Sequence, residues 1–280
     1  YLSDQFQSNT NFDKYLTDVR MMKEANMNMV RVYCVVEKEE FYEACDQEGI
    51  LVYQDFPMQG RMSDSSDLVR RSVPQARDMV NQLFNHPSIV IWTFGAQPGL
   101  KNFEKICLAL STAARLEDPY RFIQQGASVW EWKLIKDKYD WPIDYHFFCG
   151  WFSPEFKQAP FHPREVLELP PEECASGASV EELKIKKSEL LEFVSEYGTA
   201  DSLPDLDSLK KFINEKDLWP VNWKRFTYRG LHADRLLKWA GKFNNIEEMI
   251  EASQNYQAFV LKYHTEFYRR HKFNPCNGAL

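Results

Sequence analysis

Residues 193–198 read Phe-Val-Ser-Glu-Tyr-Gly, and they are the most informative part of this chain. A short apolar run of this kind is typical of a buried strand in a parallel sheet, because helices cover both faces of such a strand. The run brings the carboxylate of Glu196 to its end. In barrels of alternating strands and helices, the chemistry sits at the carboxyl ends of the strands. Glu196 is therefore a candidate nucleophile or acid, although a strand-end glutamate is more often solvated or ion-paired.

Strand and helix signals alternate along the rest of the chain. Repeated strand–helix units imply a parallel sheet with right-handed crossovers. We find no Gly-x-Gly-x-x-Gly and no Walker loop, the commonest reasons for an open nucleotide-binding sheet. The fold class expected is therefore α/β, a (β/α)8 TIM barrel. Helices are expected over residues 11–26, 39–48 (ended by Gly49), 66–85, 101–116, 206–214, 231–242 and 246–271, and strands over 27–34, 50–55, 88–95, 121–126, 143–148 and 191–197.

The length of 280 residues suits one large α/β domain. We expect residues 1–280 to form a single barrel domain of a longer multidomain chain. Its strands are expected to be cut at both ends, the first at Tyr1-Leu2 and the eighth at residues 278–280. The segment 152–188 is rich in Pro and Glu, which predicts a loop or an insertion.

Composition argues against several classes of protein. The net charge is -7 and no long basic run occurs, which argues against nucleic acid or an anionic membrane as a partner. No run approaches the roughly 18 apolar residues that a membrane span needs. The six cysteines are scattered without a Cys-x-x-Cys pair, so neither a zinc site nor a dense disulfide framework is expected. No cofactor or metal is implied, and the compartment is left open.

Several functional side chains fall at or near the ends of expected strands. A polar cluster among aromatic walls is what a sugar-binding pocket requires, and aromatic residues make up 15% of the chain. Each residue also has a purely structural explanation: Arg31 and Asp55 as a buried ion pair, His146 as a core imidazole, Trp92 as packing. The group consists of Arg31, Asp55, Gln97, His146 and Glu196, with Trp92, Trp130 and Trp151 in or near the same strands and loops.

The order of several motifs over nearly the whole chain is specific. These motifs are Glu24–Val32, Phe41–Phe56, Asn85–Ile89, Asp118–Arg121, Asp144–His146, Phe193–Gly198 and Ser253–Ala258, with Glu266 and Arg270. In this order they resemble glycoside hydrolase family 2, particularly its β-mannosidase-like members and less closely its β-galactosidase and exo-β-glucosaminidase members.

The resemblance implies a fold, an activity and a set of site residues. It implies a (β/α)8 catalytic barrel, with flanking β-sandwich domains elsewhere in the same chain, that hydrolyses a β-linked glycoside, a β-mannoside first and a β-galactoside or β-glucosaminide next. Glu196 would be the nucleophile of a retaining mechanism, in which a second carboxyl group about 5–5.5 Å away protonates the leaving oxygen. Arg31, Asp55, His146 and Trp151 would hold the sugar hydroxyls and the ring face.

The chain departs from the family where that second carboxyl group is expected. The family ends its fourth strand with Asn-Glu, and aligned from Trp92 this chain has Ala96 and Gln97 there. An amide neither donates a useful proton nor takes one from water, so general acid/base help worth about 10²–10⁴-fold in rate would be missing. Glu37 or Asp55 could serve as a substitute acid. The alternative is a carbohydrate-binding pseudoenzyme on the same barrel.

Overall fold

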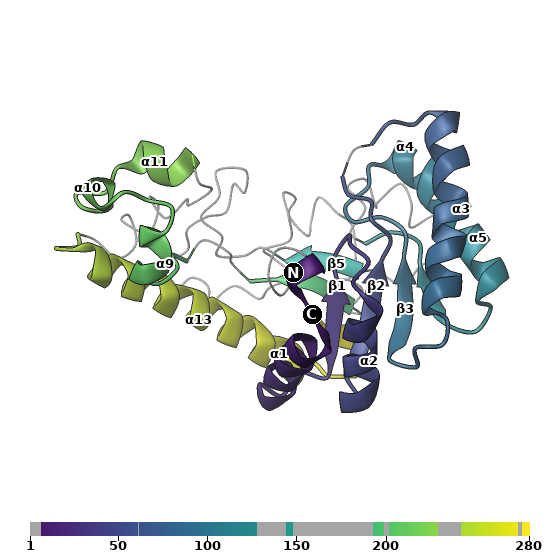
Figure 1. The fold of residues 1–280 in the computed structure, drawn as a ribbon, viewed down its shortest axis with the longest axis horizontal. Helices are drawn as coiled ribbons and strands as arrows, with labels where there is room; N and C mark the ends of the chain where they lie inside the picture. The colour runs from purple at the N-terminus through teal and green to yellow at the C-terminus, as the bar shows by residue number, and fades with distance from the viewer. Residues whose placement is uncertain are drawn as a thin grey trace. The chain divides into compact units, whose positions relative to one another are not determined.

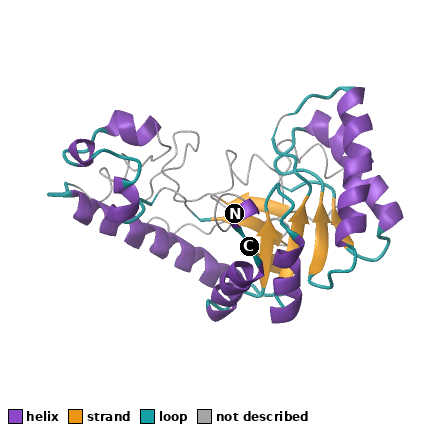
Figure 2. Ribbon diagram, viewed as in Figure 1, coloured by secondary structure: helices purple, strands orange, loops and turns teal. Residues whose placement is uncertain are grey.

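In a computed structural model of the chain, the structure describes residues 7–60, 62–127, 144–147, 193–198, 202–228, 242–273 and 276–280. They fall into two compact units, residues 1–142 with Leu280 and residues 143–279. Both units contain parallel strands accompanied by helices (Figures 1 and 2).

The first unit alternates helices with strands. Its strands pair in parallel in the order β1-β2-β3-β4, so all four carboxyl ends lie along one edge of the sheet. A short 3₁₀ turn, Gln7–Asn9, precedes the first helix, and a π-helical turn, Phe103–Cys107, joins α4 to α5. The elements are α1 (Phe12–Glu24), β1 (Met29–Val32), α2 (Glu39–Glu48), β2 (Leu51–Asp55), α3 (Ser66–Leu83), β3 (Ile89–Thr93), α4 (Leu100–Asn102), α5 (Leu108–Glu117) and β4 (Phe122–Gln124).

Local sequence fixes the ends of these helices. The side chain of Asn11 accepts a hydrogen bond from the backbone N–H of Lys14 at 3.0 Å, and this satisfies one of the donors that the first turn of α1 leaves open. Gly49 ends α2 in the left-handed conformation, with φ of 73°, which a residue without Cβ adopts at least cost. The expected end of this helix at Gly49 is confirmed.

One apolar core holds the first unit together. Figure 1 shows α3 beside α5 and α1 beside α2 along the sheet. Burying large side chains between these layers stabilises them by about 25 cal/mol for each Å² of apolar surface removed from water. The largest contributors, each less than 2% exposed, include Tyr42, Leu83, Trp92 and Phe94.

The second unit joins a three-stranded parallel sheet to a long helix. Its strands pair in the order β5-β6-β7. The apolar residues Met249, Tyr256 and Val260 of α13 recur at helical spacing and form a second core. The elements are β5 (Asp144–Phe147), β6 (Phe193–Tyr197), α9 (Leu206–Lys210), α10 (Glu215–Leu218), α11 (Trp223–Tyr228), α13 (Ile246–Arg270) and β7 (Gly278–Ala279).

Reciprocal capping starts α13. The side chain of Asn245 accepts from the backbone N–H of Glu248 at 2.8 Å, and the Glu248 carboxylate accepts from the backbone N–H of Asn244 at 2.9 Å. Arg269 and Arg270 lie in the last turn, where the helix dipole favours positive charge. These signals set both ends of the helix close to the expected 246–271.

The expected fold class, α/β with parallel strands, is confirmed. The described strands form two separate sheets, and closure into one barrel is not seen among them. The helix expected over 101–116 is interrupted by the π-helical turn, and the one expected over 206–214 ends at Lys210. The segment 152–188 and nearly all of the helix expected over 231–242 lie outside the described residues.

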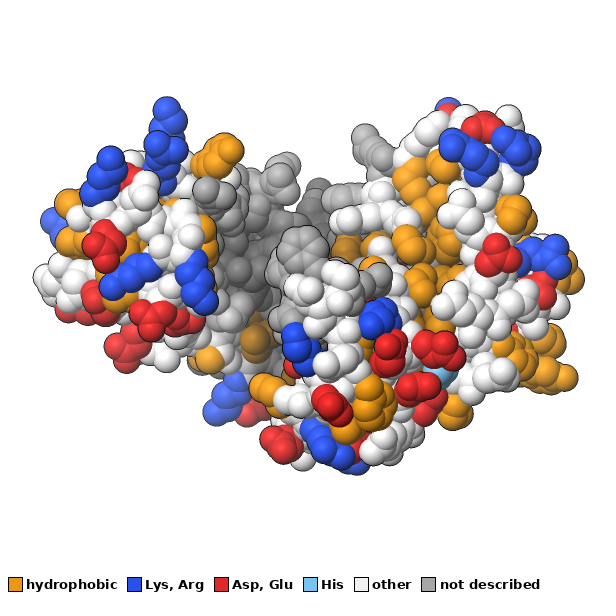
Figure 3. Space-filling model, viewed as in Figure 1, with side chains coloured by type: hydrophobic (Ala, Val, Ile, Leu, Met, Phe, Trp, Pro, Cys, Tyr) orange, Lys and Arg blue, Asp and Glu red, His pale blue; other side chains and the backbone are white. Residues whose placement is uncertain are grey.

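The described surface carries mixed charge. On the face drawn in Figure 3, Lys and Arg side chains alternate with Asp and Glu side chains, as is typical of a solvated surface. None of the helices within the described ranges is long and apolar enough to span a bilayer.

A buried histidine gives the second unit a pH-dependent stability. His264 on α13 is 0% exposed and packs against the rings of Tyr197 and Tyr268. Among the described residues, neither of its ring nitrogens has a hydrogen-bond partner. Burial lowers its pKa from 6.5 to about 4. The unfolded chain therefore takes up a proton before the folded one, and stability falls as pH is lowered from about 6.5 to about 4, by at most about 3 kcal/mol.

We expect His264→Phe to remove this part of the pH dependence, as measured by urea denaturation at a series of pH values. His271→Gln, a change of a partly exposed histidine at the end of the same helix, is the control. Equal losses of stability with acid in the wild type and in His264→Phe would contradict the prediction.

Candidate functional site

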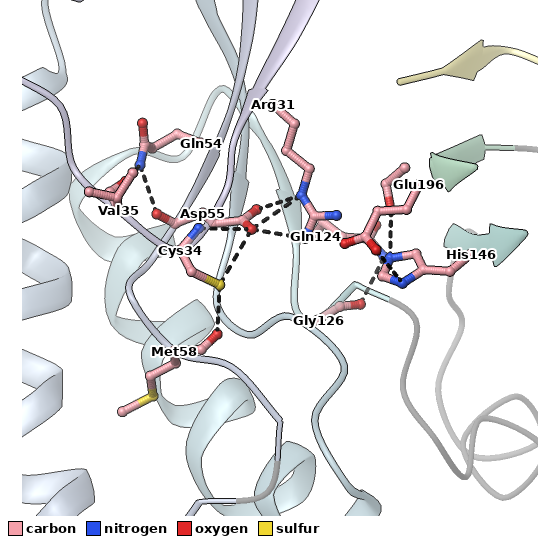
Figure 4. Close-up of polar contacts among 11 residues, drawn as sticks. Arg31, Cys34, Val35, Gln54, Asp55, Met58, Gln124, Gly126, His146 and Glu196 are labelled. Atoms are coloured by element: carbon pink, nitrogen blue, oxygen red, sulfur yellow. Dashed lines mark hydrogen bonds and ion pairs between the residues drawn. The ribbon is translucent and has the colours of Figure 1, made fainter. Parts of the chain in front are cut away.

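A buried ion pair joins β1 to β2 at the carboxyl edge of the first sheet. Arg31 Nη2 lies 2.8 Å from Asp55 Oδ2, and Arg31 Nε donates to both carboxylate oxygens at 3.2 Å (Figure 4). The two side chains are 5% and 0% exposed. Burial raises the pKa of Asp55, while the Arg31 guanidinium and the Cys34 amide oppose that shift. The structural explanation that the sequence offered for this pair, a buried ion pair, is confirmed.

The turn after β1 supports this pair. Cys34 has φ of 53°, the left-handed region that a non-glycine residue adopts only when its surroundings hold it there. Its backbone N–H donates to Asp55 Oδ2 at 3.3 Å, and its thiol donates to the Met58 carbonyl at 3.3 Å (Figure 4). Cys34 thus ties the ends of β1 and β2 together, a role that the sequence did not indicate.

Glu37 lies among helix side chains. It is 4% exposed, and its carboxylate accepts a hydrogen bond from the Tyr15 hydroxyl of α1 at 2.9 Å. Its backbone N–H donates to the Tyr42 hydroxyl of α2 at 3.1 Å. Tyr42 in turn donates to Gln54 at 2.6 Å. Glu37 therefore belongs to a buried network that connects α1 and α2 to β2.

The backbone after β3 continues the sheet beyond its last strand residue. Ala96 N–H donates to the Met58 carbonyl at 3.0 Å, and Gly60 N–H donates to the Ala96 carbonyl at 2.8 Å. On the other side, Gln97 N–H donates to the Ala127 carbonyl at 2.7 Å. These bonds fix the backbone at Gln97, which has φ of 50°.

The turn after β3 is also packed closely against Cys107. A Cβ at Gly95, whose φ is 157°, would lie 2.7 Å from Cys107 Sγ in the π-helical turn. A larger residue at this position would require Cys107 to move and would adopt a strained backbone conformation. Gln97, next to this turn, is partly exposed.

In the second unit, β5 and β6 bring an imidazole to the carboxylate of Glu196. His146 Nδ1 lies 3.3 Å from Glu196 Oε2, and His146 Nε2 lies 3.0 Å from Ser195 Oγ (Figure 4). The His146 side chain is 0% exposed and that of Glu196 is 26% exposed. The residue that the sequence missed here is Ser195, although it lies inside the stretch that singled out Glu196.

The tryptophans that the sequence suggested for the site are not found among the polar groups described above. Trp92 is 0% exposed in the core of the first unit, and its indole N–H donates to Asp118 at 2.9 Å. This placement gives Trp92 a packing role and corrects the expected sugar contact, because a strand residue that faces the helices cannot also line a pocket on the other face. Trp130 and Trp151 lie outside the described residues. Within the described ranges, no group of three His, Cys, Asp or Glu side chains could hold a metal ion.

Known sequences and structures resemble this chain along its whole length. Residues 6–139 match the family described as "Glycosyl hydrolases family 2, TIM barrel domain". A β-mannosidase of Bos taurus is 24% identical over 321 aligned residues, which cover 99% of this chain and 33% of that protein. β-Mannosidase B of Thermothelomyces thermophilus is 38% identical over 93 residues, 32% of this chain and 11% of that protein.

A solved structure agrees on the fold. The crystal structure of a β-D-mannosidase from Dictyoglomus thermophilum superposes with a TM-score of 0.72 at 22% identity, covering 97% of this chain and 32% of that one. The fold is thus that of the family 2 TIM barrel domain, and the resemblance to β-mannosidase-like members is confirmed. The chain spans about a third of the length of its full-coverage relatives.

Breaking the Arg31–Asp55 pair is expected to destabilise the first unit. Asp55→Ala removes the carboxylate that pairs with a buried guanidinium, and breaking a buried pair in this way costs about 3–5 kcal/mol in the free energy of unfolding. The double variant Arg31→Met/Asp55→Ala removes both charges and should recover part of that loss. Urea denaturation of the three proteins measures these differences. A double variant that is less stable than Asp55→Ala would contradict the prediction.

Proposed function

We propose, since this chain belongs to glycoside hydrolase family 2, that it is the catalytic barrel of an enzyme that hydrolyses a β-linked glycoside with retention of configuration. The observation that carries the proposal is Glu196. It ends a parallel strand, its side chain is 26% exposed, and His146 lies against one carboxylate oxygen. A partly exposed, oriented carboxylate at a strand end suits a nucleophile.

The mechanism follows from that carboxylate. One oxygen of Glu196 attacks the anomeric carbon and forms an ester, while the bond to the aglycone oxygen breaks and its electron pair leaves with that oxygen. Water then hydrolyses the ester. In the first step the leaving oxygen needs a proton unless it is already a weak base, and this requirement makes the leaving group decisive here.

The substrate is proposed to be a β-mannoside before a β-galactoside or a β-glucosaminide. The relatives that align with 99% of this chain support this order, because those proteins are named β-mannosidases. We propose that Arg31, Asp55 and His146 hold sugar hydroxyls and that Trp151 covers the ring face. The rest of the enzyme is proposed to include β-sandwich domains, which the fraction of relatives covered supports.

Gln97 favours a second candidate, a carbohydrate-binding pseudoenzyme. Neither proposed substitute acid is well placed to replace a glutamate at this position. Glu37 is engaged by Tyr15 among the helices, and both oxygens of Asp55 are engaged by Arg31. In this second candidate, the barrel keeps the carboxylate of Glu196 but lacks an acid to accompany it.

Intact mass spectrometry after incubation with 2,4-dinitrophenyl β-glycosides tests the proposed nucleophile. Dinitrophenolate leaves without a proton, so Glu196 is tested separately from the acid. We expect a one-sugar adduct on Glu196, formed fastest with the mannoside and absent from Glu196→Gln. No adduct and no dinitrophenol release with mannoside, galactoside, glucoside or glucosaminide would overturn the hydrolase and leave the binding module.

Restoring the acid tests the second candidate. We expect Gln97→Glu to raise turnover of an unactivated alkyl β-glycoside by about 10²–10⁴-fold, while glycosylation by the dinitrophenyl glycoside changes little. Gln97→Asn is the matched control, since it alters the side chain without supplying an acid. High native turnover of the alkyl glycoside, unaffected by either change, would show that another residue supplies the proton.

A further inference from the structure

The polar contacts around Glu196 depend on an irregularity in the pairing of β5 with β6. Tyr145 pairs with Val194, but the next residue of β5, His146, pairs with Glu196. Ser195 is therefore the extra residue of a β-bulge. In a regular strand, Ser195 and Glu196 would point to opposite faces. The bulge interrupts this alternation and lets one imidazole reach both side chains, and bulges of this kind re-aim side chains next to active sites.

The positions of the two ring nitrogens favour one tautomer of His146. Nδ1 lies 3.3 Å from Glu196 Oε2. A carboxylate oxygen is only an acceptor, so this contact requires the proton on Nδ1. In the neutral ring Nε2 then carries the lone pair, so the Ser195 hydroxyl, whose oxygen lies 3.0 Å away, would be the donor in this contact. The chain of donation runs from Ser195 to His146 to Glu196.

We infer that Ser195 is a positioning residue for the nucleophile. Its hydroxyl holds the neutral His146 in the Nδ1–H form, and that N–H fixes Glu196 Oε2 and favours the ionised carboxylate. The inference rests on the proposed function for the role of Glu196, but the tautomer itself rests only on the geometry of β5 and β6.

The same connectivity does not make Ser195 a nucleophile. Serine, histidine and carboxylate joined in this order are the parts of an acyl-transfer triad. Ser195, however, is 3% exposed, while the side chain of Glu196 is 26% exposed. Of the three side chains joined by these contacts, the carboxylate is the one that a substrate can reach, and the serine hydroxyl is buried.

Other titratable groups on the surrounding elements are few. Asp144 and Tyr145 lie on β5, and β7 contributes only glycine and alanine. Tyr197 points to α13, where its hydroxyl contacts Thr265 at 2.8 Å and its ring packs against His264 and Tyr268. Since Tyr197 follows Glu196 along the strand beyond the bulge, these α13 groups lie on the opposite face of β6 from Glu196.

Nitrogen-15 NMR of the histidine-labelled full chain tests the tautomer without any requirement for turnover. We expect His146 to show a protonated Nδ1 and an unprotonated Nε2 at neutral pH. The signals of His146 are assigned as those missing from the spectrum of His146→Gln. A ring protonated on both nitrogens, or on Nε2 alone, would overturn the inference. If no glycoside reacts, the proposed function fails, and this spectrum still decides the tautomer.

The pH dependence of dinitrophenyl glycoside cleavage tests the effect on Glu196. In Ser195→Ala we expect the acid limb of kcat/KM to move up by about one pH unit. Without the serine hydroxyl, His146 no longer stays in the Nδ1–H form, so Glu196 loses a hydrogen bond that favours its ionised state. Ser195→Thr, which keeps the hydroxyl, should restore the wild-type limb. Ser253→Ala is the matched control, because Ser253 is another buried serine of this unit and, among the described residues, its hydrogen bonds go to Ile250 and Leu203. An acid limb at the same pH in Ser195→Ala and in the wild type would contradict the inference.

Discussion

Parallel pairing of short buried strands is the constraint on which the rest of this structure depends. Such strands have their backbone groups satisfied by their neighbours, so helices can cover them, and their carboxyl ends all reach the same edge. In the first unit this places Arg31 beside Asp55 and extends the sheet through Ala96 to Gln97. In the second unit it places His146 beside Glu196. The order of the strands thus decides which of the polar groups in the proposed function come together.

The sequence predicts where helices and strands lie better than it predicts which face of a strand each side chain occupies. Apolar runs and Gly49 located α2, β2 and β6 closely, because burial and a left-handed cap leave local signals. The face on which a side chain lies was harder to predict. Trp92 lies in a strand of continuous apolar residues, and without an alternation of polar and apolar residues the two faces of the strand cannot be told apart from the sequence. In the structure Trp92 faces the core. Ser195 was missed because a bulge leaves no signal in one strand alone; it appears only when β6 is paired with β5.

The proposed mechanism requires a nucleophile and an acid, and the structure supports the two positions unequally. The carboxylate of Glu196 is supported by a strand end, an imidazole and a buried hydroxyl. At the position where the family's acid is expected, the structure keeps a backbone fixed by hydrogen bonds on both sides, yet the side chain is the amide of Gln97. An amide hydrogen-bonds without transferring a proton at neutral pH, so under the proposed function we expect reaction only with glycosides whose leaving group departs as a stable anion. In the proposed mechanism the glycosyl ester forms as the leaving oxygen departs, so without an acid this step would be slow for a glycoside of an ordinary alcohol.

Chemical rescue of Glu196→Ala is the most direct test that Glu196 is the nucleophile. The variant would be incubated with the 2,4-dinitrophenyl β-mannoside in the presence and absence of sodium azide, and the products identified by NMR. We predict almost no dinitrophenol release without azide, and restored release with azide that yields the α-glycosyl azide, because the small anion occupies the space of the missing carboxylate. Release by Glu196→Ala at the wild-type rate without azide would contradict the account.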